Sequence, residues 1–212
     1  MKSALKSLIR SHYIDLQGYV SAGMEVKKDD STIFMNANEN PFSLPGLEGF
    51  NRYPEPQPEK LLQGYAQLYG VAPDNIIMTR GADEAIVILV KLFCEPGKDA
   101  IVVHPPTFGM YPVGAHSMPA SVLEVPLIKA NGSYGLDVDG LIAAGKKAET
   151  KLIFICSPNN PTGHSFPRAD IEKIIKETEG HAVVLLDETY IEFSKEESFA
   201  PKLKNYPNLI IL

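Results

Sequence analysis

Tryptophan is absent from the 212 residues, and cysteine occurs only twice, as Cys94 and Cys156. Each cysteine lies within a run of apolar residues, which is typical of small buried side chains. Two cysteines cannot supply the disulfide framework of a small secreted domain. We therefore expect no disulfide.

Long hydrophobic runs and an excess of positive charge are also missing. No apolar stretch approaches the roughly 20 residues that a membrane-spanning helix needs. The net charge of -6 argues against a general nucleic-acid or membrane-surface role. Residues 1–10 include basic side chains but lack the apolar core and cleavage site of a signal peptide. We expect a cytoplasmic protein with no nucleic-acid or membrane partner.

Several common motifs for cofactors and metals are absent as well. No Gly-x-Gly-x-x-Gly follows a predicted strand, and no Gly-x-x-x-x-Gly-Lys run continues into the Ser or Thr of a phosphate-binding loop. The five histidines are spread along the chain without the spacing of metal ligands. We predict no metal site, and a phosphate-binding site has to be sought elsewhere.

What the sequence does contain is a regular alternation of strand-like and helix-like segments after residue 58. Strands are expected at 75–79, 100–104, 121–126, 151–156, 182–186 and 208–212, and helices near 61–69 and at 82–94, 108–117, 138–147 and 168–178. Such alternation predicts βαβ units, and so an α/β fold with a mainly parallel sheet flanked by helices.

The preceding residues have few structural signals, and alternating prolines at 54, 56 and 58 exclude a helix. We therefore expect an extended N-terminal arm over 1–58, including part of a small domain, and a large domain over 59–212.

Polar side chains follow two of the predicted strands. Asn160 lies in the run Ser157-Pro158-Asn159-Asn160-Pro161-Thr162-Gly163, and Asp187 and Tyr190 follow the strand at 182–186. Open α/β sheets bind their ligands at the carboxyl ends of parallel strands. Simpler interpretations are a turn at Asn160 and a capping role for Asp187.

Two further segments could contribute to the same site. Gly81 permits a tight turn before a helix whose first N–H groups, near Ala82 and Asp83, could bind an anion. Acidic residues in a first turn can also simply offset the helix dipole. Phe108 follows another strand and could stack on a planar ring, although packing in the core is an equal alternative.

The motifs around Asn160, Asp187 and Tyr190 resemble the pyridoxal 5'-phosphate (PLP) site of fold-type I aminotransferases. The runs Arg52-Tyr53-Pro54-Glu55-Pro56 and Gly81-Ala82-Asp83-Glu84 resemble the histidinol-phosphate aminotransferase branch of that family. The resemblance covers residues 36–212 in family order. It implies transamination of histidinol phosphate with 2-oxoglutarate in histidine biosynthesis, and hence amine and 2-oxo acid substrates.

The resemblance also implies roles for individual residues. Asp187 would pair with the pyridine nitrogen, and Asn160 and Tyr190 would donate hydrogen bonds to the ring oxygen. Phe108, where the family often has tyrosine, would stack on the ring. The remaining contacts would be with the cofactor phosphate: backbone groups of Ala82 and Asp83, and Tyr53 reaching across a homodimer interface. Tyr53 could instead be an exposed tyrosine of a linker.

In the family, the strand matching 209–212 leads into the segment that carries the Schiff-base lysine. That segment is not part of this sequence, and we expect the 212 residues alone to be inactive. Two alternatives stay open: a PLP-dependent decarboxylase or lyase acting on a phosphorylated amino acid, and a non-catalytic, truncated large-domain fragment. The identity of the amino donor is open as well.

Overall fold

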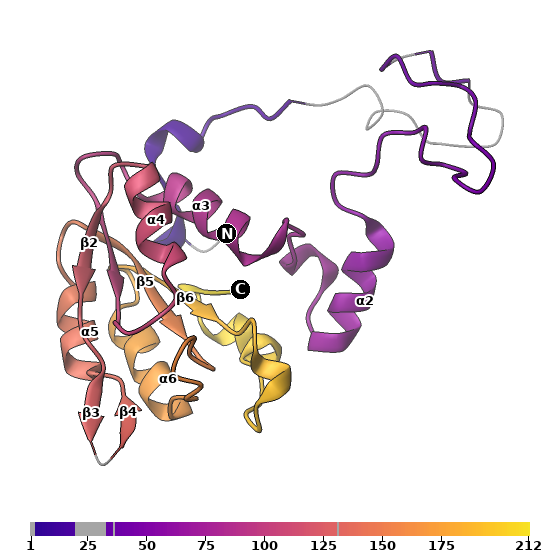
Figure 1. Ribbon diagram of the computed structural model, residues 1–212. Helices are drawn as coiled ribbons and strands as arrows, with labels where there is room; N and C mark the ends of the chain where they lie inside the picture. Colours follow the sequence, from indigo (N-terminus) through magenta and orange to yellow (C-terminus); the bar gives the residue numbers. More distant parts are fainter. Residues whose placement is uncertain (1–2, 20–32, 36, 131) are drawn as a thin grey trace.

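The computed structural model describes residues 3–19, 33–35, 37–130 and 132–212, and its centre is a five-stranded parallel sheet (Figure 1). The strand order is β2-β1-β5-β6-β7, and every neighbouring pair is parallel. The strands are β1 (Ala100–Val103), β2 (Ser121–Glu124), β5 (Thr150–Cys156), β6 (Val183–Asp187) and β7 (Leu209–Ile211). The predicted α/β fold with a mainly parallel sheet is confirmed.

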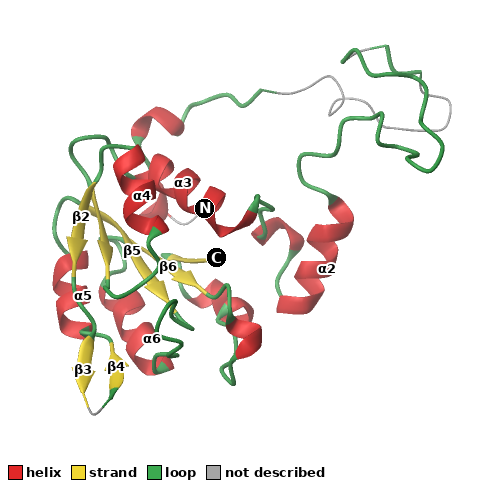
Figure 2. Cartoon of the chain, in the orientation of Figure 1, coloured by secondary structure: helices red, strands yellow, loops and turns green. Residues whose placement is uncertain are grey.

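Helices cover both faces of the sheet, as Figure 2 shows. Helices α3 (Gly81–Phe93) and α4 (Met110–Ser117) pack on one face, and α5 (Val138–Gly145) and α6 (Arg168–Glu177) pack on the other. Successive residues of β5 alternate between the two cores: Ile153 and Ile155 face α5 and α6, whereas Leu152 and Phe154 face α3 and α4. Because both faces of the central strands are buried, β1 and residues 183–186 of β6 are entirely apolar.

The prediction of a strand at 75–79 is wrong. Pro73–Asn75 form a short 3-10 helix, and residues 76–79 are extended without joining a sheet. The side-chain amide of Gln57 bonds both backbone groups of Met78, donating to its carbonyl at 3.0 Å and accepting from its N–H at 2.7 Å. A glutamine side chain thus occupies the hydrogen-bonding groups that a neighbouring strand would use.

A hairpin that the sequence analysis did not predict joins β3 (Ile128–Ala130) to β4 (Ser133–Gly135) in antiparallel register. The remaining helical elements are α1 (Ser3–Lys6), α2 (Glu59–Tyr69) and the short 3-10 helices Ser11–Tyr13, Ile191–Phe193 and Ala200–Asn205. Among the described residues, no helix is long and apolar enough to cross a membrane.

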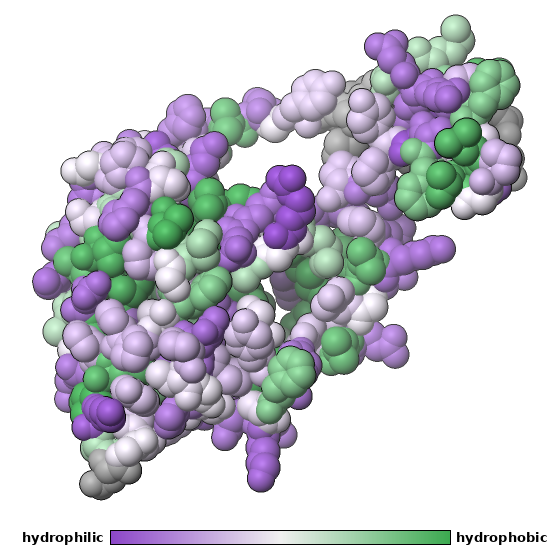
Figure 3. Space-filling view, viewed as in Figure 1, coloured by the Kyte–Doolittle hydropathy of each residue, from purple (hydrophilic) through white to green (hydrophobic). Residues whose placement is uncertain are grey.

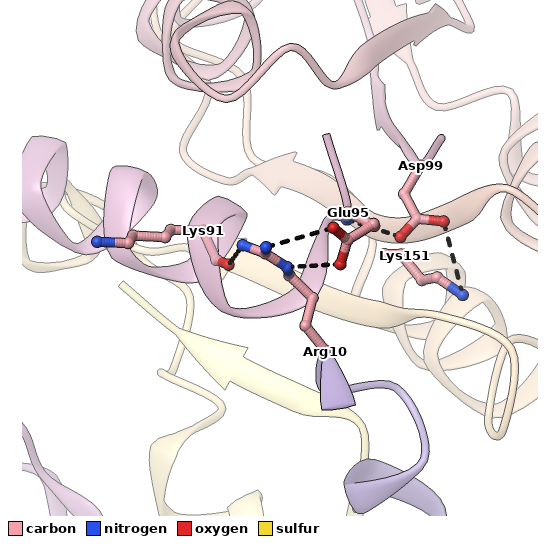
Figure 4. A network of polar contacts seen from close by, with 5 residues as sticks. All are labelled: Arg10, Lys91, Glu95, Asp99 and Lys151. Atoms are coloured by element: carbon pink, nitrogen blue, oxygen red, sulfur yellow. Dashed lines mark hydrogen bonds and ion pairs between the residues drawn. The ribbon is translucent and has the colours of Figure 1, made fainter. Parts of the chain in front are cut away.

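The start of the chain is fastened to the carboxyl end of α3 (Figure 4). The Arg10 guanidinium donates to Glu95 at 2.9 Å and to the Lys91 carbonyl at 3.0 Å. The N–H of Glu95 in turn donates to Asp99 at 2.7 Å. Leu8, close to this contact, is buried in the core between α3 and the sheet. This part of the expected N-terminal arm therefore packs against α3 and the sheet.

The part of the arm at 37–58 has a different character. It projects away from the sheet without regular secondary structure (Figure 1). Large apolar side chains of this part are exposed, among them Phe42, Leu44 and Phe50. Figure 3 shows hydrophobic residues exposed beside hydrophilic ones on this projection.

Candidate active site

A cavity of about 220 Å³ opens where β5 and β6 end and α3 begins. The register of the sheet places Cys156 of β5 directly beside Asp187 of β6, and the N–H of Ser157 donates to the Asp187 carbonyl at 2.9 Å. The residues that line the cavity come from four segments: Arg80, Gly81, Ala82, Asp83, Phe108, Cys156, Asn160, Asp187, Thr189 and Tyr190.

Asp187, the last residue of β6, places a buried carboxylate against this cavity. The residue is 3% exposed. Its Oδ2 accepts a hydrogen bond from the Tyr111 hydroxyl at 2.7 Å, and its Oδ1 accepts one from the Thr189 N–H at 3.0 Å. A buried carboxylate is stable only when hydrogen bonds or an opposite charge compensate its lost hydration. The two donors fix the carboxylate and leave room for a cationic partner in the cavity.

Tyr111, which was not nominated from the sequence, lies behind the cavity and contacts Asp187. It is fully buried, stacks on Phe154 with 4.5 Å between ring centroids, and meets Phe108 edge to face at 5.6 Å. Burial and the negative charge of Asp187 raise the pKa of the Tyr111 hydroxyl far above its ordinary value. The hydroxyl therefore stays protonated and acts as a donor.

The two adjacent asparagines after β5 have different surroundings. The Asn159 side chain donates to the Pro106 carbonyl at 3.0 Å and to Thr162 at 2.8 Å, and it accepts from Thr107 at 3.0 Å. Asn160 lies on the cavity wall, and within the described parts of the chain its side-chain amide has no hydrogen bond. Asn159 therefore stabilises the loop, whereas the Asn160 amide is unengaged at the cavity wall.

The amino end of α3 forms another wall. Gly81 has a φ of 77°, a left-handed conformation that favours glycine. Glu84 accepts from the Arg80 N–H at 2.7 Å and pairs with the Arg80 guanidinium at 2.8 Å, so its charge is paired with that of Arg80. In the described structure no side chain caps the first turn. The N–H groups of Ala82 and Asp83 are thus available to an anion, which the helix dipole also favours.

Six of the seven predicted site residues line this one cavity: Ala82, Asp83, Phe108, Asn160, Asp187 and Tyr190. Tyr53 does not line it. Tyr53 lies in the projecting part, 69% exposed, where its backbone N–H donates to Glu39 at 2.7 Å. Cys156 and Thr189 line the cavity without having been nominated from the sequence. Spacing alone could have suggested Tyr111, because it lies three residues after Phe108 at the start of a helix.

A second, more open hollow of about 590 Å³ adjoins the cavity and shares Asn160 and Tyr190 with it. Its other lining residues include the strongly exposed Phe193 and the charged side chains of Lys195 and Glu196. Among the described residues, no group of three His, Cys, Asp or Glu side chains could hold a metal ion. The cavity is lined by two acidic residues, Asp83 and Asp187, by Arg80, by amide and hydroxyl groups, by aromatic rings and by a helix terminus.

The aminotransferase class I and II family model matches residues 36–212. The chain belongs to this family. Its similarity to curated family members extends over the whole sequence: it is 42% identical to the histidinol-phosphate aminotransferase of Buchnera aphidicola subsp. Schizaphis graminum, covering 100% of this chain and 59% of that protein. It is also 42% identical to the enzyme of the same name from Xylella fastidiosa strain 9a5c, covering 97% of this chain and 56% of that protein.

Solved structures share the fold. Histidinol-phosphate aminotransferase from Sinorhizobium meliloti, in complex with pyridoxal-5'-phosphate, matches 76% of this chain and 43% of that chain with a TM-score of 0.67 and 24% identity. At this identity the likeness concerns the fold alone. The chain thus spans somewhat more than half of its curated relatives and includes the carboxyl edge of the sheet where the cavity lies.

Proposed function

We propose that this chain is the cofactor-binding part of a PLP-dependent aminotransferase that exchanges the amino group of histidinol phosphate with 2-oxoglutarate, in histidine biosynthesis. The names of the two curated relatives support the substrate. The observation that carries the proposal is the buried carboxylate of Asp187, held by two donors at the floor of a cavity whose other wall is a free helix terminus.

The residues around the cavity fit the parts of PLP. A buried carboxylate suits a protonated pyridine nitrogen, an uncapped helix terminus suits a phosphate, and the unengaged Asn160 amide suits a phenolate oxygen. The edge-to-face contact with Tyr111 holds Phe108 at the cavity wall, where its ring can stack on the cofactor. The chemical demands of the cofactor and the available groups agree at each of these points.

When bound, the protonated ring of PLP supplies the electron sink for removing a proton from the carbon next to the amino group. Asp187 holds the proton on the ring nitrogen through a charge-assisted hydrogen bond. Asn160 and the Tyr190 hydroxyl donate to the ring oxygen, and the N–H groups of Ala82 and Asp83 hold the phosphate. The Phe108 ring excludes water from one face, which strengthens the interaction of Asp187 with the ring.

The binding part of this proposal can be tested with pyridoxamine 5'-phosphate, which needs no covalent bond to the protein. We expect the 212-residue chain to bind it, and Asp187→Asn to weaken binding about 10- to 100-fold, because a charged hydrogen bond contributes about 1.5–3 kcal/mol. Asp139→Asn is the matched control, since this exposed carboxylate on α5 pairs with Lys173 outside the cavity. Equal affinity of all three proteins would contradict the proposal.

The reaction is tested on the gene product that contains this chain. We expect histidinol phosphate to convert bound PLP stoichiometrically to pyridoxamine 5'-phosphate, and 2-oxoglutarate to reverse the change. A decarboxylase or lyase acting on a phosphorylated amino acid would return PLP unchanged after each turnover. That result would replace transamination with the second reaction class.

We extend the proposal to the domain division of the chain, its cellular location and its oligomeric state. We divide the chain into an arm over 1–58, with part of the small domain, and a cofactor-binding domain over 59–212, and we place the protein in the cytoplasm as a homodimer. The exposed apolar side chains of the projecting part support a dimer, because a second copy would cover them. In this arrangement Tyr53 reaches the phosphate of the neighbouring subunit.

Light scattering on the wild type and on a Phe50→Ser variant tests the dimer. We expect twice the chain mass for the wild type and a concentration-dependent decrease for the variant. A monomeric wild type at all concentrations would contradict the homodimer.

A further inference from the structure

The Asp187 carboxylate is oriented by two donors from different parts of the fold. Thr189 donates through its backbone immediately after β6, whereas Tyr111 donates through its side chain from α4, 76 residues earlier in the chain. With only one hydrogen bond, the carboxylate could still rotate about the Cβ–Cγ bond of Asp187. Two bonds, one to each oxygen, fix its plane.

The Tyr111 hydroxyl can serve this purpose because its own position is fixed. The ring lies nearly parallel to Phe154, at an interplanar angle of 21°, and nearly perpendicular to Phe108, at 83°. One turn further along α4, Gly114 lies close to Ile86 of α3, so the helix sits tightly against its neighbour. These contacts position the ring, and its hydroxyl oxygen lies 2.7 Å from the Asp187 carboxylate.

Tyr111 is also joined to a second wall of the cavity. The ring that carries the hydroxyl meets Phe108, so one side chain contacts both the residue that would stack on the cofactor and the residue that would pair with its nitrogen. Phenylalanine at position 111 could fill the same space between the rings. The hydroxyl is therefore the part of Tyr111 that packing does not explain.

We propose that Tyr111 is a positioning residue for the cofactor: its hydroxyl holds the Asp187 carboxylate in the orientation that keeps the pyridine nitrogen protonated. The inference rests on the proposed function. Tyr111 itself touches the carboxylate and takes no proton, because burial and the neighbouring charge of Asp187 keep its hydroxyl protonated.

The test uses Tyr111→Phe and pyridoxamine 5'-phosphate labelled with ¹⁵N in the ring. The nitrogen chemical shift, followed against pH, gives the midpoint at which the bound ring loses its proton. We expect the variant to bind about tenfold more weakly and to lower this midpoint by about one pH unit, since one hydrogen bond to a charged group corresponds to about a factor of ten. A role limited to packing would leave the midpoint unchanged.

Tyr206→Phe is the matched control. The Tyr206 hydroxyl also donates to a carboxylate, that of Glu172 at 2.8 Å, but on the opposite face of the sheet. We expect this variant to bind the ligand as the wild type does. In the Asp187→Asn background, Tyr111→Phe should change affinity less than twofold, because the hydroxyl acts through the carboxylate.

The outcomes separate the inference from the proposed function. If the wild type binds the ligand and Tyr111→Phe leaves affinity and midpoint unchanged, the inference is wrong and the proposed function stands. A higher midpoint would also overturn it, because the hydroxyl would then act by withdrawing charge from Asp187. A wild type that does not bind the ligand would overturn both.

Discussion

Asn159 and Asn160 are chemically identical neighbours whose roles the structure separates. The Asn159 amide is saturated by loop atoms, whereas the Asn160 amide faces the cavity. We expect Asn160→Ala to weaken binding of pyridoxamine 5'-phosphate about tenfold without changing the free energy of unfolding. Calorimetric titration and urea unfolding measure the two quantities.

Asn159→Ala is the counterpart of that variant. It removes the partner of the Pro106 carbonyl and of two threonine hydroxyls, so we expect a loss of about 1–3 kcal/mol in the free energy of unfolding. If Asn159→Ala weakened ligand binding while leaving stability intact, the assignment of the two residues would be reversed.

At the scale of elements, the close contact of α4 with α3 depends on Gly114. A Cβ atom at this position would lie 2.9 Å from a methyl carbon of Ile86. We expect Gly114→Ala to destabilise the protein by about 1–3 kcal/mol, because a tightly packed core has to shift to admit the extra atom. Thermal unfolding gives the measurement.

Gly109→Ala provides the control on the same helix. Gly109 precedes α4 with an ordinary φ of -72°, and in the described structure a Cβ there would meet no atom within 4 Å. We expect a cost below about 1 kcal/mol. If the two variants lost similar free energy of unfolding, the cost would come from alanine in this helical region and not from the contact of α4 with α3.

The elements also show what the sequence could and could not predict. Apolar runs bounded by turns identified the five strands of the sheet, because a parallel sheet buried on both faces demands them. The same rule failed at 75–79, where the Gln57 amide, 21 residues from Met78, bonds the backbone. The hairpin at β3 and β4 had a usable signal in Asn131-Gly132, a dipeptide typical of two-residue hairpin loops.

The same holds for the site residues: local sequence patterns predicted some of them, and others depend on tertiary contacts. Residues at strand ends and at the start of α3 could be placed from the sequence, because parallel strands bring their carboxyl ends to one edge. The contact of Tyr111 with Asp187 depends on how α4 packs against the sheet, which no local pattern specifies. The role of Tyr53 depends on a second subunit, so a single chain does not test it.

At the scale of the whole molecule, His104 makes stability depend on pH. Burial lowers the pKa of His104 to about 4 from its ordinary value of 6.5. Its Nε2 accepts from the Cys156 N–H at 3.1 Å, and its ring meets Phe166 edge to face, so protonation would remove an acceptor inside the core. The folded state therefore excludes a proton that the unfolded state binds.

The sign of the effect follows from that difference. Between pH 6.5 and about 4 the unfolded chain binds more protons, so we expect stability to fall as pH decreases across this window, by about 3 kcal/mol from this group. Urea unfolding at several pH values gives the slope. His104→Gln, which retains an acceptor, should flatten the curve relative to wild type, and identical slopes would contradict the assignment.

The strand order described above also suits the direction in which a ribosome makes the chain. After β1 and β2 have paired, β5 adds on the other side of β1, and β6 and β7 each add beside the strand made just before them. The partners of Arg10, in α3 and at Glu95, also precede β1 in the chain. Asp187 is thus among the last cavity residues to be synthesised, and when it emerges, α3, Phe108 and Tyr111 have already been translated.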